Sequence, residues 1–180
     1  MATTMIDVVS YFIQNGTAWI RDQRAGRYPI ASLLDPDVQS ALAPFFEPPT
    51  LQSARVVVVP IIDNPPFYTE LKQAGIPIPI DFTQMGGITF VDTILVSQAI
   101  ADFDAAALRS LLFHECVHVA QYRLLGVDRF VREYVEGWAA NGFSYSAIPL
   151  ERHAYELQDR FVSRQQAIFL VEESIRERFS

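Results

Sequence analysis

Residues 114–118 read His-Glu-Cys-Val-His and contain two of the three histidines in the chain. On a helix, residues i and i+4 lie one above the other, so both imidazoles can bind one Zn²⁺ ion. The glutamate after the first histidine is then placed to take a proton from a water molecule that the metal activates. Metal-dependent hydrolases use this arrangement. The spacing therefore predicts His114 and His118 as zinc ligands and Glu115 as the general base.

The motif must lie on a helix, and its surroundings favour one. Residues 104–125 contain neither glycine nor proline and are apolar on nearly every side, which is typical of a helix at the centre of a domain. Asp102 or Asp104 is a suitable N-cap, and Gly126 is suited to end the helix. Buried imidazoles are costly unless they are paired, and metal ligation would pair both. Cys116 points to another side of the helix, and we interpret it as a small core residue.

The third metal ligand must come from later in the chain. A three-histidine site would need glycine and histidine where this sequence has Gln121 and Leu124. The later side chains that we consider as the third ligand are Glu133, Glu136, Glu151 and His153. The first two equally suit a solvated helix surface, and the last two both flank the apolar stripe of the final helix. The residues alone leave this choice open.

The composition predicts one compact cytoplasmic domain. The chain has 180 residues, half of them apolar, and a net charge of −7 that argues against nucleic acid or a polybasic membrane contact. One cysteine excludes an internal disulfide and fits a reducing compartment. We find no signal peptide and no run of apolar residues long enough to span a membrane.

The other predicted elements give an α+β fold, with strands in the first half and helices in the second. A helix is expected over residues 5–24, interrupted near Asn15-Gly16, and a short one over 37–46, closed by Glu47-Pro48-Pro49. Strands are expected at 55–59, 88–91 and 93–96, the last two being either two short strands or one bent strand, and the proline-rich segment 63–82 is expected to be a long loop. Helices are further expected over 128–140 and 149–176.

Two segments resemble a known family. Residues 112–122 (LFHECVHVAQY) and 148–155 (IPLERHAY) are similar to the zincin-like metallopeptidases of the DUF4157 type. Those proteins have a helix of the form LLxHExxHxxQ, and related ones have a later helix, N/I-P-x-E-x-x-A-Y, with an acidic third ligand. Residues 87–96 are similar to the strand that precedes the motif in that group. The resemblance covers roughly residues 35–160 and leaves out the first thirty.

The resemblance implies a gluzincin-like site and a single zincin-like domain. It implies Glu151 as the third ligand beside His114 and His118, a zincin-like core over 35–180 and an N-terminal helical extension over 1–34. The family often has a second acidic residue where this chain has His153, which could compete for the metal or hydrogen-bond the reaction intermediate. Zincins also place a tyrosine or histidine beside the oxyanion, and the local residues of these types are Tyr134, Tyr145, His153 and Tyr155.

The predicted function is a zinc-dependent peptidase or amide hydrolase acting on a protein or peptide. In zincins an edge strand holds the extended substrate, and residues 88–96 are the segment expected to do so here. One alternative is a non-catalytic binding or scaffold module, in which zinc has four protein ligands and a structural role. The other is a metal-free helical domain with buried histidines.

Overall fold

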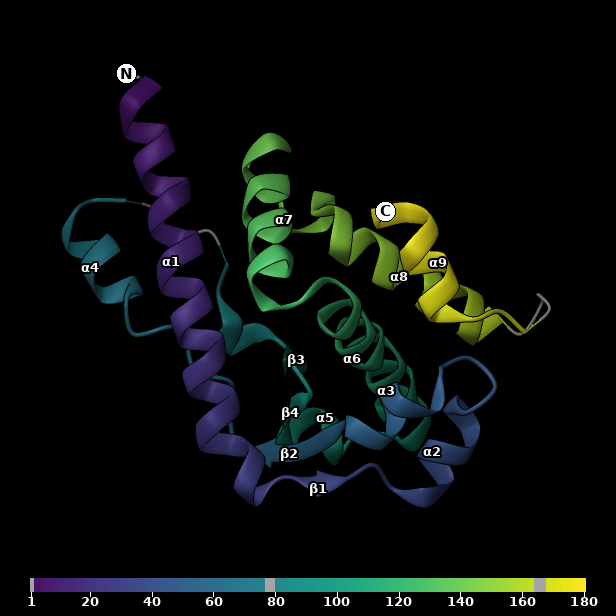
Figure 1. Ribbon diagram of the computed structural model, residues 1–180. Coiled ribbons are helices and arrows are strands. Elements are labelled where there is room, and N and C mark those ends of the chain that lie inside the picture. The colour runs from purple at the N-terminus through teal and green to yellow at the C-terminus, as the bar shows by residue number, and fades with distance from the viewer. Residues whose placement is uncertain (1, 77–79, 164–167) are drawn as a thin grey trace.

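The computed structural model describes residues 2–76, 80–163 and 168–180 (Figure 1). The fold is α+β, as the sequence predicts, and all strands in the described ranges lie before residue 98. The α-helices in these ranges are α1 (Ala2–Arg27), α2 (Pro36–Leu42), α3 (Pro48–Ser53), α4 (Tyr68–Gln73), α5 (Gln98–Ala101), α6 (Ala105–Leu125), α7 (Val127–Ala140), α8 (Pro149–Ser163) and α9 (Val171–Phe179). Short 3-10 helices are η1 (Tyr28–Ile30), η2 (Phe82–Gln84) and η3 (Tyr145–Ala147).

One mixed sheet is formed by β1 (Ser32–Leu33), β2 (Arg55–Val59), β4 (Thr93–Ser97) and β3 (Gly87–Phe90), in that spatial order. Strands β2 and β4 are parallel, and the outer strands are antiparallel to their neighbours. The strands expected at 55–59, 88–91 and 93–96 are thus confirmed as separate strands, except that Val91 lies in the turn and not in β3. A two-residue turn at Val91-Asp92 joins β3 to β4, and Arg24 of α1 binds the Asp92 carboxylate through two hydrogen bonds. This topology leaves β3 at the edge of the sheet.

Helix α6 is the central element, as its sequence predicts. Every residue from Leu112 to Tyr122 is buried, and the helix contributes side chains to both hydrophobic clusters of the core. Asp104 is the N-cap, because its carboxylate accepts a hydrogen bond from the backbone N–H of Ala107. Gly126 ends the helix with a φ of 76°, in the left-handed region that favours glycine.

The interruption expected near Asn15-Gly16 is wrong, because α1 is continuous. It packs along α7, and the two helices lie side by side in Figure 1. The Asn15 side chain donates to the carbonyl of Tyr11 within the helix, and Gly16 faces Val131 of α7. Tertiary packing therefore outweighs the roughly 1 kcal/mol by which glycine disfavours a helix interior.

Three further expectations are corrected. The segment 63–82 is not a continuous loop, because α4 and the start of η2 lie in it; its Pro77 and Pro79 fall outside the described residues. The helix expected over 37–46 ends at Leu42, and Pro48-Pro49 begin α3 instead of only closing α2, since proline suits a helix's first turn. The final helix is divided into α8 and α9, with residues 168–170 non-helical between them.

Within the described ranges, no helix combines the length and the apolar character needed to span a membrane.

Candidate metal centre

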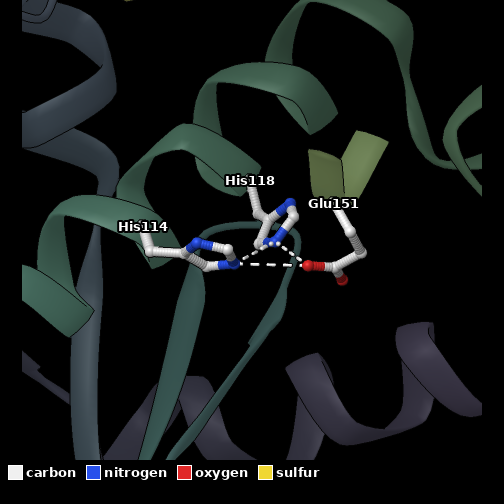
Figure 2. Close-up of side chains that lie close together, drawn as sticks. All are labelled: His114, His118 and Glu151. Atoms are coloured by element: carbon white, nitrogen blue, oxygen red, sulfur yellow. Dashed lines mark hydrogen bonds and ion pairs between the residues drawn. The ribbon is translucent and has the colours of Figure 1, made fainter. Parts of the chain in front are cut away.

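Three buried side chains from two helices converge at one point. His114 and His118 project from the same face of α6, and Glu151 projects towards them from the first turn of α8 (Figure 2). The relative exposure of each is 5 % or less. Helices α6 and α8 pack directly against one another, and this contact brings residue 151 to the histidines.

The three facing atoms form a nearly equilateral triangle. The Nε2 atoms of the two histidines lie 3.1 Å apart. Oε2 of Glu151 lies 3.3 Å from Nε2 of His114 and 3.4 Å from Nε2 of His118. The structure therefore brings together the two predicted histidines and one of the four later side chains considered as the third ligand.

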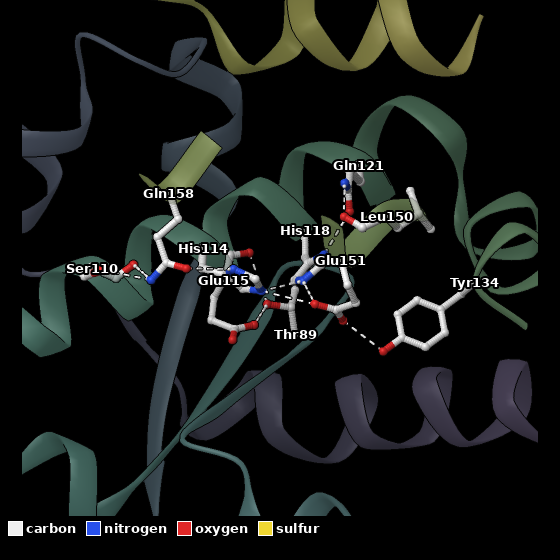
Figure 3. Close-up of polar contacts among 10 residues, drawn as sticks. All are labelled: Thr89, Ser110, His114, Glu115, His118, Gln121, Tyr134, Leu150, Glu151 and Gln158. Atoms are coloured by element: carbon white, nitrogen blue, oxygen red, sulfur yellow. Dashed lines mark hydrogen bonds and ion pairs between the residues drawn. The ribbon is translucent and has the colours of Figure 1, made fainter. Parts of the chain in front are cut away.

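Side-chain amides fix the orientation of both imidazoles (Figure 3). Nδ1 of His118 lies 2.8 Å from Oε1 of Gln121, whose amide nitrogen donates to the Leu150 carbonyl. Nδ1 of His114 lies 3.1 Å from Oε1 of Gln158. The amide nitrogen of Gln158 in turn donates to the carbonyl and the hydroxyl of Ser110.

These bonds determine where the imidazole protons are. Because a main-chain carbonyl accepts from each amide nitrogen, each amide oxygen must face a histidine and accept from its Nδ1–H. Both Nε2 atoms then turn a lone pair towards the carboxylate of Glu151. Three acceptors at such short separations repel one another unless a cation lies among them. A proton or a metal ion can fill that role, and support from outer hydrogen bonds of this kind is typical of histidine metal ligands.

The charges in the cluster are strongly coupled. Burial lowers the pKa of His118, but the charge and hydrogen bond of Glu151 outweigh burial and raise this pKa to about 9. Burial raises the pKa of Glu151, but the charges and hydrogen bonds of the two histidines outweigh burial. The net effect holds the pKa of this carboxyl well below its usual value, so it is ionised at neutral pH. Without a metal, His118 therefore stays protonated at neutral pH.

Glu115 lies beside the triangle and is held by β3. The hydroxyl of Thr89 donates to Oε2 of Glu115 at 2.7 Å and also lies 3.1 Å from its main-chain oxygen. A Cβ atom at Gly87 would approach Oε1 of Glu115 to 2.8 Å, so the glycine leaves room for the carboxylate. Burial raises the pKa of Glu115, an effect that the neighbouring histidines and Thr89 oppose. A raised pKa suits a group that has to accept a proton.

Of the tyrosines predicted near the site, Tyr134 contacts the cluster most directly. Its hydroxyl donates to Oε1 of Glu151 at 2.8 Å, the oxygen that does not face the histidines (Figure 3). Burial, followed by the charge of Glu151, raises the pKa of both Tyr134 and Tyr145, so both stay protonated donors. Tyr155 lies one helical turn after Glu151, with its ring centroid 4.4 Å from that of His114, and is 44 % exposed.

The structure does not bring His153 to the cluster. Two residues after Glu151, it points to a different side of α8, where Nε2 lies 2.8 Å from the hydroxyl of Ser174 in α9. Burial, with the nearby charge of Arg178, lowers the pKa of His153 to about 4, so it is neutral at pH 7. A role as ligand or oxyanion donor, expected from the sequence, does not fit this position.

The other side chains considered as ligands are also elsewhere. Glu133 forms an ion pair with Arg129 on the surface of α7, and Glu136 is exposed. Cys116 is fully buried in the core, as predicted, and burial raises the pKa of its thiol.

A largely apolar cavity adjoins the cluster. It has a volume of about 890 Å³, including its opening to solvent, and its walls come from α1, α4, β3 and α7. The facing atoms of His114, Glu115, His118 and Glu151 border it at one end. Several of its aromatic rings come from segments far apart in the sequence: Phe12, Trp19, Tyr68, Phe82, Phe130 and Trp138.

Sequence reasoning missed several residues that complete the site. Thr89 was considered only as part of the strand expected to hold the substrate and Gly87 only as the first residue of the segment similar to a family strand, and Gln158 and Ser110 were not singled out. Their partners lie 26 to 48 positions away in the sequence, so no local spacing signals them. Gln121 was the exception, since it is part of the motif that carries the family resemblance.

Comparison with known proteins finds no matching family model, no matching curated protein and no matching solved structure.

Proposed function

We propose that this protein is a zinc-dependent peptidase with a zincin-like fold. The observation that carries the proposal is the triangle of His114, His118 and Glu151 with Glu115 beside it, at the end of a cavity. Ligands about 2.0–2.1 Å from a tetrahedral zinc ion lie about 3.3–3.4 Å from one another. The observed separations of 3.1, 3.3 and 3.4 Å are close to these values.

The number of ligands favours catalysis over a structural role. Structural zinc sites have four protein ligands, whereas catalytic sites have three and keep one position for substrate or water. In the part of the chain that the structure describes, the group able to hold a metal has three members. The scaffold alternative needs a fourth ligand, and His153, the residue considered for it, is bonded to Ser174 instead.

The chain's own residues supply the remaining chemistry. When bound, zinc acidifies water and polarises a carbonyl group. Glu115 accepts the proton of the attacking water and passes it to the leaving amine, and Thr89 holds its carboxylate in place. Gln121 and Gln158 keep the imidazoles oriented. Tyr145 borders the cavity, and its hydroxyl is hydrogen-bonded to Glu151 and to the hydroxyl of Tyr155, so these two tyrosines are the candidate donors to the developing negative charge.

Strand β3 offers a place for the peptide backbone. Next to the ladder between β3 and β4, the backbone N–H of Ser97 donates to the carbonyl of Gly86. In an antiparallel pair, hydrogen-bonded and non-hydrogen-bonded residues alternate, so the backbone N–H and C=O groups of Gly87 and Thr89 point away from β4. No strand in the described ranges pairs with that side. An extended peptide can therefore add to this edge beside Glu115.

The test compares Glu115→Gln with Glu136→Gln, which changes an exposed glutamate of α7. We expect Glu115→Gln to bind one zinc per chain and to lower hydrolysis of a peptide mixture by about 10²–10⁴-fold, the usual contribution of a general base. Glu136→Gln should behave as the unmodified protein. Metal content is measured by elemental analysis and cleavage by mass spectrometry. Unchanged hydrolysis in Glu115→Gln, or no stoichiometric zinc in either protein, contradicts the proposal.

A further inference from the structure

The cavity beside the metal centre has a chemical character that limits the substrate. Apart from the cluster and Tyr134 and Tyr145, its lining is dominated by aromatic and aliphatic side chains. One wall is α1, the N-terminal helix that lies outside the segments resembling a known family. Figure 3 shows the α1 ribbon opposite that of α6, with the cluster between them.

We propose that this cavity binds a large apolar side chain, aromatic or branched aliphatic, of the residue next to the scissile bond of a peptide. The inference rests on the proposed peptidase function and adds which substrate side chain the site prefers. A polar side chain would lose its hydration here and gain few partners, because the lining is mainly aromatic and aliphatic and its polar groups away from the cluster are tyrosine hydroxyls, Thr89 and the indole N–H groups, that of Trp138 being unpaired. An apolar group would instead leave water for contact with Phe12, Trp19 and Trp138.

The position of β3 favours a peptide over a fatty acyl chain. Gly87 and Thr89 border the same cavity, and they are the residues whose backbone groups point away from β4. A peptide paired with this edge would direct alternate side chains to one side. One of them would enter the cavity while the backbone carbonyl stays near Glu115. An acyl chain has no backbone groups with which to pair.

Gly16 of α1 lies at the border of this cavity, where α1 contacts α7. It borders the cavity, and a Cβ atom there would lie 3.7 Å from Cγ1 of Val131, an ordinary contact distance. Because Val131 also borders the cavity, a larger side chain at residue 16 would take up space beside it and narrow the cavity. Gly26, on the same helix, is exposed and has no atom within 4 Å of an added Cβ. The two glycines form a matched pair in which one position faces the cavity.

The experiment uses the zinc-loaded full chain with Gly16→Leu and Gly26→Leu. The substrates are two peptides that differ only in Phe or Ala next to the cleaved bond, and an N-dodecanoyl amide. We expect the unmodified protein to prefer the Phe peptide over the Ala peptide by at least about tenfold in kcat/KM. Gly16→Leu should remove most of this preference, and Gly26→Leu should retain it. Gly16→Ala, with its single added methyl group, gives an intermediate preference and serves if the leucine variant does not fold.

Binding separates this inference from the proposed activity. Titration calorimetry of the Phe peptide on zinc-loaded Glu115→Gln should give tighter binding than the Ala peptide, and Gly16→Leu in that background should abolish the difference. Binding that depends on Gly16 without hydrolysis by the unmodified enzyme would contradict the peptidase and support the cavity's role. Hydrolysis with equal Phe and Ala rates, or a preference unchanged by Gly16→Leu, overturns the inference. Preference for the dodecanoyl amide overturns the assignment to a peptide.

Discussion

At the scale of single residues, the proposed metal centre depends on hydrogen bonds to the imidazole nitrogens that face away from it. Gln121 and Gln158 accept from the Nδ1 atoms of the histidines, and this leaves both Nε2 lone pairs directed at the carboxylate of Glu151. The same arrangement that suits a metal ion also binds a proton tightly, because Glu151 raises the pKa of His118. Proton and metal therefore compete for one position.

This competition predicts how zinc affinity changes with pH. The pKa of His118 is raised to about 9, so at any lower pH zinc must displace a proton. We expect the affinity to fall about tenfold for each pH unit between pH 8 and pH 6. Competition with a chromogenic chelator at several pH values measures this zinc affinity.

His153 provides the control for that titration. Its pKa of about 4 keeps it neutral throughout this range, and it contacts Ser174 instead of the cluster. His153→Gln should therefore leave the pH dependence unchanged. An affinity that is constant from pH 6 to pH 8 would show that no proton is displaced and would contradict the coupling between His118 and Glu151.

At the scale of elements, β3 determines where Glu115 points. Thr89 of this strand donates its hydroxyl hydrogen to Oε2 of Glu115. Gly87, which has no Cβ atom, leaves room for Oε1 of the same carboxylate. The edge position of β3 follows from the order of the sheet, and its distance from α6 follows from their direct packing. Glu115, the proposed general base, is thus oriented by an element that precedes its own helix in the chain.

Thr89→Val tests this orientation. The change keeps the shape of the side chain and removes a hydrogen bond that lowers the pKa of Glu115. We expect kcat/KM to fall about tenfold, as for one lost hydrogen bond of about 1.5 kcal/mol to a charged group. The acid limb of the pH profile should move to higher pH, because a carboxyl with a higher pKa is protonated sooner. Thr89→Ser keeps the hydroxyl and should retain the original profile; equal profiles for the two variants would exclude this role.

The elements predicted correctly are those whose signals are local. Helix α6 has an apolar run, an N-cap at Asp104 and a terminal Gly126, and β2 has four consecutive β-branched residues. The interruption of α1 was wrong because a glycine's local cost was offset by packing on α7, which no nearby residue indicates. The break between α8 and α9 was missed for a similar reason. Val171 and Ile175 of α9 pack back into the core cluster that contains Ala154 and Leu157 of α8.

The same distinction holds for the site. His114, Glu115 and His118 follow from a spacing within five residues, but the residues alone left four possible third ligands. The contact between α6 and α8 brings Glu151 to the histidines and turns His153 away. The supporting bonds from Thr89 and Gln158, and the cavity, depend on distant segments meeting in three dimensions.

At the scale of the whole molecule, the cluster joins two helices that belong to the central part of the core. A metal that binds only the folded chain stabilises it, and at a free concentration of about 1,000 Kd the gain is about 4 kcal/mol. For a domain of this size, each kcal/mol changes the melting temperature by roughly 2–4 °C. We therefore expect chelation to lower the Tm by roughly 8–16 °C while the protein still melts cooperatively. Glu151→Gln removes a ligand and should show a much smaller shift.

The pH dependence of that shift distinguishes a metal from a proton at the centre. Without metal, the raised pKa of His118 contributes stability that is complete below the unfolded value of about 6.5 and is lost as pH rises through about 9. Zinc binding strengthens over the same range. The difference in Tm between the zinc-loaded and chelated protein should therefore widen from pH 6 to pH 8, as measured by differential scanning calorimetry. A Tm difference that narrows as pH rises would mean that the proton of His118 and the zinc ion do not compete for the same position. That result would exclude the triangle of His114, His118 and Glu151 as the metal centre.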